Sequence, residues 1–295
     1  MRPAALRQAE FPREGIGAEL LAAWLDCDPA CLVTTNSGTS ALFLALHAAG
    51  VHGGAVATTP MTFIATTTAI YQAGARPAWI DVDKGSCLVL RRPALLHDER
   101  AMMLVAWAGY VPDLSLFQSL GVPLILDAAQ ALGAKHDGDP VHRFADFTCY
   151  SFAPTKHLTT GDGGAVVCKD RGAADRIRRL AWFGMRRKPV GPERWPSDQN
   201  VPEAGFKMHM NGIAAALGLA GLDGLDAALE ACRANAACYN AIIGTEKAYT
   251  SGAAPWTYTV FAEDPAHFVA YMAEHGVAAG QPHRRNDAND FNRPS

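Results

Sequence analysis

The sequence predicts an α/β fold in which helices cover both faces of a mostly parallel central sheet, with a short α+β segment at the C-terminal end. Three observations lead to this prediction. Predicted strands and helices alternate between residues 31 and 127. The strands are continuous apolar runs, as in sheets that are buried on both faces. Turn-forming residues such as glycine, serine and proline follow several of the strands.

The first predicted strand (residues 31–35) follows a weak N-terminal helix and leads into a polar turn, with an Ala/Leu-rich helix at residues 41–49. The turn, residues 36–40, brings glycine, serine and threonine to the start of that helix. Unpaired N–H groups and the helix dipole favour an anion at such a point, and Thr39 and Ser40 add hydroxyl donors. An ordinary helix cap is the alternative interpretation, because serine and threonine are common caps.

The alternation of strands and helices then continues to Asp127. Open α/β sheets bind ligands beyond the carboxyl ends of their strands, so residues just after each strand are candidates for a site. Phe63 and Asp127 both lie at such positions. The predicted strands cover residues 55–59, 77–82, 102–107 and 123–127, and the predicted helices cover residues 62–73 and 113–120.

Asp127 ends a very apolar strand, where a carboxylate is rarely without a partner. One interpretation is a cap for a helix that starts at Ala128. The functional interpretation is a fixed negative charge that keeps the ring nitrogen of a ligand protonated. Gln130, three residues further on, would reach the same ligand from the first turn.

A single lysine stands between two apolar strands in residues 146–167. The pattern predicts a strand at 147–152, a loop with Lys156, a glycine turn at 161–164 and a return strand at 165–167. Burial of an ammonium is costly, and desolvation lowers the pKa of a lysine so that it becomes a nucleophile for carbonyl carbons. A surface hairpin with a solvated lysine is the alternative.

Helices dominate the chain after the return strand. We divide the chain into a large domain (residues 1–230) and an abbreviated C-terminal domain (residues 231–295) of α+β type. The predicted elements are a basic helix at 171–182, a long Gly/Pro/Arg-rich loop at 183–203, a small-residue helix at 206–222 that continues at 226–243, a strand at 256–261 and a helix at 265–275.

Basic side chains in the loop and near the C-terminus are candidates for binding an anionic substrate. Arg187 lies in the long loop, and His283 and Arg284 lie near the end of the chain. A solvated loop and a frayed terminus are the alternative interpretations, since basic residues are mostly exposed.

Composition limits the class of protein. The net charge of −3 and pI of about 6.4 give no electrostatic reason to expect nucleic acid or an anionic membrane as a partner. No uninterrupted apolar run reaches the roughly 18 residues of a membrane span, and the N-terminus does not resemble a signal peptide. The seven cysteines are scattered and have no zinc-like spacing. We therefore expect a cytoplasmic protein without a metal.

Five short motifs, each weak alone, follow one another in the order and at the spacing of one family. They are GTSAL at 38–42, TPMTFIAT at 59–66, DAAQALG at 127–133, SFxxxK at 151–156 with GDGG at 161–164, and HMN at 209–211 before an Ala-rich helix. In these motifs the chain resembles the DegT/DnrJ/EryC1/StrS family of sugar aminotransferases. The resemblance implies the aspartate-aminotransferase (type I) fold and pyridoxal 5'-phosphate as cofactor.

The resemblance also implies roles for individual residues. Lys156 would hold the cofactor aldehyde covalently and later move a proton, and Asp127 would pair with the pyridinium nitrogen. The other implied cofactor contacts are Gln130 on the ring hydroxyl, Phe63 stacked on the ring, Thr39, Ser40 and Ser151 around the phosphate, and Asn211 reaching the phosphate of the neighbouring subunit in a homodimer.

The reaction implied by the resemblance is transfer of an amino group from L-glutamate to a nucleotide-linked keto sugar of the 4-keto-6-deoxy type, in amino sugar and polysaccharide biosynthesis. Relatives with histidine in place of the lysine dehydrate the sugar, whereas here His157 only neighbours Lys156. Two alternatives stay open: another keto substrate of cyclitol or aminoshikimate type, and a truncated, inactive paralogue that acts as a partner subunit. The chain is short for the family at both ends, which leaves the substrate pocket the least defined part.

Overall fold

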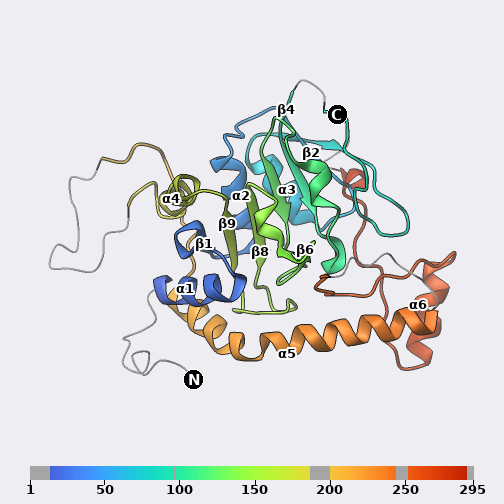
Figure 1. Cartoon of the computed structure of the whole chain (residues 1–295). Coiled ribbons are helices and arrows are strands. Elements are labelled where there is room, and N and C mark those ends of the chain that lie inside the picture. The colour runs from blue at the N-terminus through green and yellow to red at the C-terminus, as the bar shows by residue number, and fades with distance from the viewer. Residues whose placement is uncertain (1–13, 96–97, 187–199, 244–251, 291–295) are drawn as a thin grey trace.

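The computed structural model describes residues 14–95, 98–186, 200–243 and 252–290. Its centre is a seven-stranded sheet, which confirms the predicted α/β fold (Figure 1). The strands are β1 (Leu32–Thr35), β2 (Ala55–Thr58), β3 (Arg76–Trp79), β4 (Glu99–Val105), β5 (Leu124–Asp127), β8 (Phe147–Ser151) and β9 (Gly164–Cys168). Their order is β1-β9-β8-β5-β4-β2-β3, and only β9 runs antiparallel to its neighbours.

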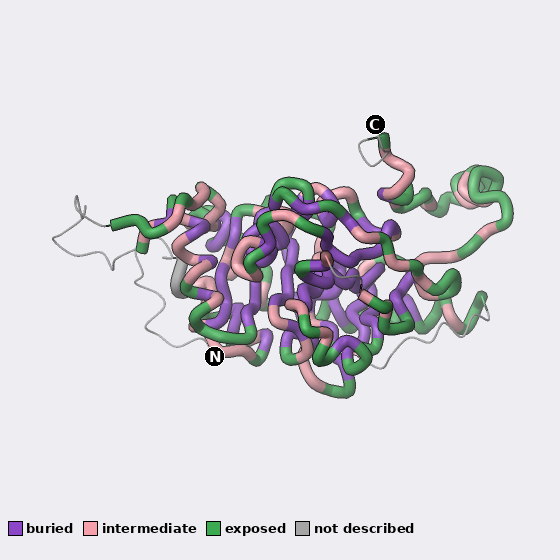
Figure 2. Tube along the Cα trace, turned by 90° about the horizontal axis from the view of Figure 1, so that it is seen from above, coloured by how far each residue is buried: buried purple, intermediate pink, exposed green. Residues whose placement is uncertain are grey.

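Helices form a layer on each face of this sheet. Side chains alternate between the two faces along each strand, so that Met103 and Ile125 pack towards one layer and Leu104 and Leu126 towards the other. Figure 2 shows the resulting buried core in purple. The first layer holds α2 (Gly38–Ala48), α3 (Ile64–Gln72) and α4 (Arg171–Leu180), the second holds α1 (Glu14–Leu25) and α5 (Gly212–Ile243), and α6 (Pro265–Glu274) lies in the C-terminal part.

Short elements fill the connections. The chain contains a small hairpin and five single turns of 3-10 helix in its described part. The hairpin consists of β6 (Lys135–His136) and β7 (Asp139–Pro140), and the turns are η2 (Pro29–Cys31), η3 (Trp107–Gly109), η4 (Leu114–Phe117), η5 (Val141–Arg143) and η6 (Asn286–Ala288). The helix predicted at residues 113–120 is thus only the turn η4.

The carboxyl ends of the parallel strands meet at one edge of the sheet, where β9 begins. Gly164, the first residue of β9, is paired with both Thr35 at the end of β1 and Ser151 at the end of β8. Asp127 ends β5 on the other side of β8. This edge therefore collects the turn after β1, the residues after β5 and the loop after β8.

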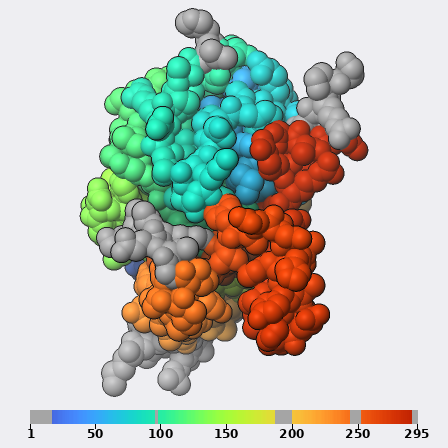
Figure 3. All heavy atoms as spheres, turned by 90° about the vertical axis from the view of Figure 1, so that its right-hand side faces the viewer, coloured from blue at the N-terminus to red at the C-terminus, as the bar shows by residue number. Residues whose placement is uncertain are grey.

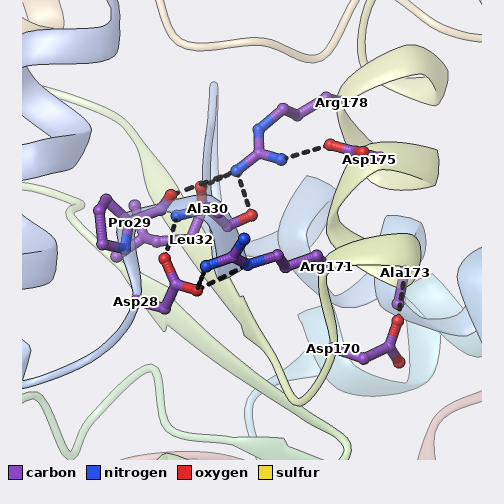
Figure 4. Close-up of polar contacts among 9 residues, drawn as sticks. All are labelled: Asp28, Pro29, Ala30, Leu32, Asp170, Arg171, Ala173, Asp175 and Arg178. Atoms are coloured by element: carbon purple, nitrogen blue, oxygen red, sulfur yellow. Dashed lines mark hydrogen bonds and ion pairs between the residues drawn. The ribbon is translucent and has the colours of Figure 1, made fainter.

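Two arginines of α4 fix the chain where it enters β1 (Figure 4). The Nη2 atom of Arg178 donates to the carbonyl oxygens of Ala30 at 2.6 Å and Leu32 at 3.0 Å. Arg171 forms an ion pair with Asp28 at 2.7 Å. These contacts join the start of β1 to α4, the helix that follows the end of its neighbour β9.

Two predicted elements are wrong at the site edge. The helix predicted from Ala128 is a pair of turns, in which Ala131 N bonds Ala128 O at 2.9 Å. The strand predicted at residues 256–261 is an irregular segment. Its first backbone group, Trp256 N, donates to Ala108 O at 2.8 Å across the edge of the sheet rather than to a strand beside it.

The small-residue helix begins later than predicted. Residues 206–211 are extended because they form bridges with the residues around Trp182 and with Thr35, and α5 starts only at Gly212. From there α5 is continuous to Ile243, so the proposed boundary between the domains, at residue 230, falls inside a helix. The division into two domains stays a prediction.

By length and composition alone, α5 would be able to cross a membrane. It nevertheless carries Asp223 and Asp226, and the latter accepts a hydrogen bond from Trp24 Nε1 in α1 at 3.0 Å. One face of α5 packs on the core beneath the sheet. The buried residues of this face are Ala214, Ala215, Gly218, Leu225, Leu229 and Ala236.

Candidate functional site

Asp127 is a buried carboxylate at the carboxyl end of β5, with 6% of its surface exposed. Its Oδ2 accepts a hydrogen bond from Thr66 Oγ1 at 2.7 Å, and its Oδ1 accepts one from Ala129 N at 3.2 Å. Burial raises the pKa of Asp127, while these two donors and the nearby charge of Lys156 oppose that rise. The site thus holds a carboxylate between neutral donors, an arrangement that favours a cationic ligand atom.

Lys156 lies in the loop between β8 and β9, where its side chain is half-buried. Its Nζ atom lies 3.5 Å from the centroid of the Trp256 ring, within the range of a cation–π contact. Burial lowers the pKa of Lys156 to about 8, and Asp127 opposes this shift. A lysine in this environment is partly neutral near neutral pH, as a nucleophilic amine requires.

We expect the amine of Lys156 to become reactive at lower pH than an ordinary exposed lysine, whose pKa is about 10.4. Labelling of the cofactor-free protein with an amine-directed reagent, followed by peptide mass spectrometry, should give a rate that reaches half its maximum near pH 8 for Lys156. The peptide with Lys169, whose side chain is 65% exposed, is the internal control. Identical pH profiles for both peptides would contradict this environment for Lys156.

Trp256 is held against Lys156 by hydrogen bonds at both its backbone and its indole. Its backbone N donates to Ala108 O at 2.8 Å, and its Nε1 donates to Thr155 O at 2.6 Å. The sequence analysis missed this residue, because it lies one hundred positions from Lys156 in a segment predicted as a strand. Its position in the fold, not a local motif, brings it to the site.

Gln130 and Trp256 both form hydrogen bonds to the backbone of one loop, at Ala108. The Oε1 of Gln130 accepts a hydrogen bond from Ala108 N at 2.7 Å. Ala108 has a φ of 56°, and a Cβ on the following Gly109 would lie 1.9 Å from Ala254 O, so this loop requires glycine there. The amide oxygen of Gln130 is therefore committed to the fold, and only its Nε2 donors remain for a ligand.

The turn after β1 forms a small-residue cradle at the N-terminus of α2. Ser37 caps the helix: its Oγ accepts from Ser40 N at 3.1 Å and lies 2.9 Å from Ser40 Oγ. A Cβ on Gly38 would lie 2.7 Å from the Cβ of Ser151, so only glycine lets the helix approach the end of β8 this closely. The helix starts at Gly38 rather than at residue 41, which places Thr39 and Ser40 in its first turn.

This cradle offers an anion the first N–H groups of α2, which have no partner within the helix, and the hydroxyl groups of Thr39, Ser40 and Ser151. The structure therefore brings together the four predicted features of this edge: the anion site, Asp127, Gln130 and Lys156.

Phe63 lies directly before α3, and 52% of its surface is exposed. The imidazole ring of His283 lies 5.1 Å from the Phe63 ring and 5.5 Å from the Trp107 ring, measured between centroids. Burial and the charge of Lys156 lower the pKa of His283. Its Nε2 is buried and has no hydrogen-bond partner among the residues that the structure describes. His283 is thus part of the site.

The segment that carries His283 is anchored, not frayed. Asn286 is 1% exposed; its backbone N donates to Pro60 O and its Nδ2 donates to Thr62 O, each at 2.9 Å. Figure 3 shows these C-terminal residues in red against the blue part of the chain. Arg284, next to His283, is exposed.

Two other predicted site residues have a different status. Arg187 lies outside the described residues. Asn211 caps α5 within its own subunit, where its Oδ1 accepts from Ala214 N at 3.0 Å. Its two N–H donors remain for a group beyond the helix.

Comparison with known proteins gives one family. A model of the DegT/DnrJ/EryC1/StrS aminotransferase family matches residues 19–280. The chain is 36% identical, over 221 residues, to a UDP-4-amino-4,6-dideoxy-N-acetyl-beta-L-altrosamine transaminase of Campylobacter jejuni; the match covers 72% of this chain and 57% of the relative. It is 35% identical over 206 residues to the spore coat polysaccharide biosynthesis protein SpsC of Bacillus subtilis, covering 66% and 52%. The chain thus spans little more than half the length of these relatives.

Solved structures agree with the sequence comparison. The sugar aminotransferase CalS13 of Micromonospora echinospora superposes with a TM-score of 0.88 at 30% identity, covering 99% of this chain and 85% of that one. AtS13 of Actinomadura melliaura superposes with a TM-score of 0.86 at 30% identity, covering 96% and 82%. The similarity therefore extends over the C-terminal segment that closes the site.

Proposed function

Because the chain belongs to the DegT/DnrJ/EryC1/StrS aminotransferase family, we propose that it is a pyridoxal-phosphate-dependent aminotransferase. In this proposal it moves an amino group from L-glutamate to a nucleotide-linked keto sugar of the 4-keto-6-deoxy type. The observation that carries the proposal is the half-buried amine of Lys156, with a pKa of about 8, at the same sheet edge as the buried Asp127 and an anion cradle.

The residues of this edge fit pyridoxal phosphate. Gly38 lets the N-terminus of α2 approach Ser151 closely, so that the start of the helix and the Ser151 hydroxyl lie at one place where a phosphate would bind. Thr39, Ser40 and Ser151 would hold the phosphate, Phe63 would stack on the ring, and Gln130 would contact the ring hydroxyl through Nε2. When bound, the cofactor supplies an aldehyde for amine exchange and a protonated ring that accepts electrons from the reacting carbon.

Lys156 has two tasks in this proposal. Its amine would hold the cofactor covalently, and once released the same amine would take the proton from the reacting substrate carbon and hand it on to the cofactor. A pKa of about 8 suits both tasks, because proton transfer is most efficient when the pKa lies near the working pH. The face of Trp256, 3.5 Å away, offers a resting position for the charged amine.

Asp127 keeps a proton on the ring nitrogen. In its buried position it has two neutral hydrogen-bond donors, and a cationic nitrogen beside it would favour the ionised carboxylate. His283 is proposed to contact the substrate beside Phe63, since its Nε2 lacks a partner among the described residues. Arg187 and Arg284 are proposed to contact the nucleotide phosphates.

The proposal is tested by transfer of a labelled amino group. The purified protein, loaded with pyridoxal phosphate, is incubated with ¹⁵N-labelled L-glutamate and a panel of nucleotide-linked 4-keto-6-deoxy sugars. Mass spectrometry should detect 2-oxoglutarate and a nucleotide amino sugar that carries the heavy nitrogen. Formation of 2-oxoglutarate with no labelled sugar would reject the sugar substrate class. A labelled aminocyclitol in a parallel incubation with keto cyclitols would support the other keto substrate instead.

We also propose a homodimer that places α5 at the subunit interface, with Asn211 reaching the phosphate of the partner. Ile213 and Leu217 support this proposal: they lie one turn apart at the start of α5, directly after Asn211, and are 70% and 52% exposed. Exposed apolar side chains in one patch are typical of an interface. A cytoplasmic location is supported by the seven cysteines, all of which lie in the described residues and none of which forms a disulfide.

The dimer predicts that the double substitution Ile213→Asp and Leu217→Asp separates the subunits, because it would bury carboxylates without partners. The molar mass measured by light scattering after gel filtration should fall from twice 31.4 kDa to 31.4 kDa. The affinity for pyridoxal phosphate should fall as well, because the site loses Asn211 of the neighbouring subunit. The control is Val277→Asp, an exposed apolar residue elsewhere in the chain. A double variant that remains dimeric would contradict the interface.

A further inference from the structure

Two threonines of the TPMTFIAT motif, Thr62 and Thr66, have no role in the account above, yet both are buried. Thr66 Oγ1 donates to Asp127 Oδ2 at 2.7 Å. Thr62 Oγ1 and Thr66 Oγ1 lie 2.6 Å apart. The two hydroxyls and the carboxylate thus form one continuous line from the loop before α3 to the end of β5.

The direction of these hydrogen bonds follows from proton counting. A hydroxyl has a single proton, and an ionised carboxylate only accepts. Thr66 uses its one hydroxyl proton in the hydrogen bond to Asp127, so Thr62 must donate the hydrogen bond between the two threonines. Each donor in such a chain polarises the next and strengthens its hydrogen bond to the charge at the end.

The fold, rather than local helix geometry, decides which acceptor the Thr66 hydroxyl takes. Threonines in helices commonly donate to the carbonyl oxygen three or four residues earlier, as Thr67 does to Ile64 O at 3.0 Å. Thr66, its direct neighbour, donates across 61 positions of sequence to Asp127 instead. Thr62 is fixed in turn, because its carbonyl oxygen accepts from Asn286 Nδ2 at 2.9 Å.

We propose that Thr66 and Thr62 are positioning residues that form a hydroxyl relay, which orients the Asp127 carboxylate and holds it ionised towards the cofactor ring, and that Asn286 ties this relay to the C-terminal segment. The inference rests on the proposed role of Asp127 in cofactor binding. It joins the segment that carries His283, on the substrate side, to the carboxylate on the cofactor side. Asn286 holds the backbone carbonyl of Thr62, and two consecutive hydrogen bonds then lead from the Thr62 hydroxyl through Thr66 to Asp127.

Asp127 also faces two titratable groups that do not belong to the relay. Lys156 lies near enough for its charge to favour the ionised carboxylate. Cys149 is paired with Asp127 in the register of β5 and β8, and burial raises the pKa of this thiol well above its ordinary value, so it stays neutral. A variant that changes the ionisation of Asp127 without touching these groups therefore reports on the relay.

The test uses Thr66→Val, which keeps the shape of the side chain and removes its donor. In cofactor-free protein with ¹³C-labelled aspartate, the Asp127 carboxyl resonance, assigned by its loss in Asp127→Asn, should titrate roughly one to two pH units higher than in the unsubstituted protein. Affinity for pyridoxal phosphate, measured by tryptophan fluorescence, should fall roughly tenfold to a hundredfold, most strongly at low pH. Thr66→Ser should restore both values, and Thr62→Val should shift them in the same direction by less.

Thr67→Val is the matched control, since it removes a buried hydroxyl from the same turn of α3 but not from the relay. If Thr66→Val and Thr67→Val titrate alike, the relay is overturned. The NMR measurement needs no cofactor, so its failure is distinguishable from failure of the proposed function, which would appear as unsubstituted protein that does not bind pyridoxal phosphate.

Discussion

Replacement of Lys156 by alanine should abolish covalent retention of pyridoxal phosphate and lower the rate of amino transfer by at least roughly a thousandfold. The reason is that one amine performs both the covalent attachment and the proton transfer. Its environment is specific: half-buried, with a pKa lowered to about 8 and a Trp256 ring 3.5 Å away. Borohydride reduction followed by peptide mapping should find the cofactor on the peptide with Lys156 in unsubstituted protein and on no peptide in the variant.

Two controls separate chemistry from folding and from charge. Lys156→Arg keeps a cation but offers no amine nucleophile, so it should be as inactive as the alanine variant. Lys169→Ala removes an exposed lysine directly after β9 and should leave the cofactor on Lys156. A Lys156→Ala protein that still retains cofactor covalently would show that another lysine carries the chemistry.

Asp127→Asn should reduce turnover by roughly a hundredfold to a thousandfold while the protein still binds pyridoxal phosphate. The substitution keeps the shape of the side chain and removes the charge that holds a proton on the ring nitrogen. Steady-state kinetics should place most of the loss in kcat rather than in KM, because the charge matters most when electrons move into the ring. Turnover within a few-fold of the unsubstituted enzyme would contradict the role of Asp127.

The same variant has a predictable effect on stability. Burial raises the pKa of Asp127 above its ordinary 3.8, so the folded, cofactor-free chain binds this proton more tightly than the unfolded chain does. Between the pKa of Asp127 in the unfolded chain and its higher pKa in the folded chain, the free energy of unfolding therefore falls as pH rises. Asp127→Asn should remove that part of the fall, which thermal unfolding across the acidic to neutral range would detect. An unchanged pH dependence would mean that the carboxylate is already compensated without cofactor.

Much of the fold follows from local sequence patterns. The continuous apolar strands that end at Thr35, Asp127 and Ser151 are short, and a glycine or polar residue marks each end, so their order along the chain indicates a parallel sheet. Because parallel strands share an edge, the strand pattern predicts that the anion cradle, Phe63 and Asp127 lie together, and the family resemblance adds Lys156 to them.

The parts that local patterns do not determine depend on contacts between distant residues. An apolar run such as residues 256–261 suits a strand or an irregular segment equally, and its hydrogen bonds to Ala108 and Thr155 decide the outcome. The polar C-terminal segment suggests a frayed end, yet Asn286 buries itself against Thr62, more than two hundred positions earlier. Trp256 and Asn286 are therefore the site residues that required the structure.

The central claim is that this chain accepts an amino group from L-glutamate through cofactor held by Lys156. The most direct measurement is the absorbance spectrum of the loaded protein before and after L-glutamate is added. The account predicts a band near the visible edge that moves to shorter wavelength with glutamate and returns with 2-oxoglutarate. A protein that shows the first band but does not respond to glutamate would contradict amino transfer from this donor, and a protein that never shows the band would contradict the assignment of Lys156.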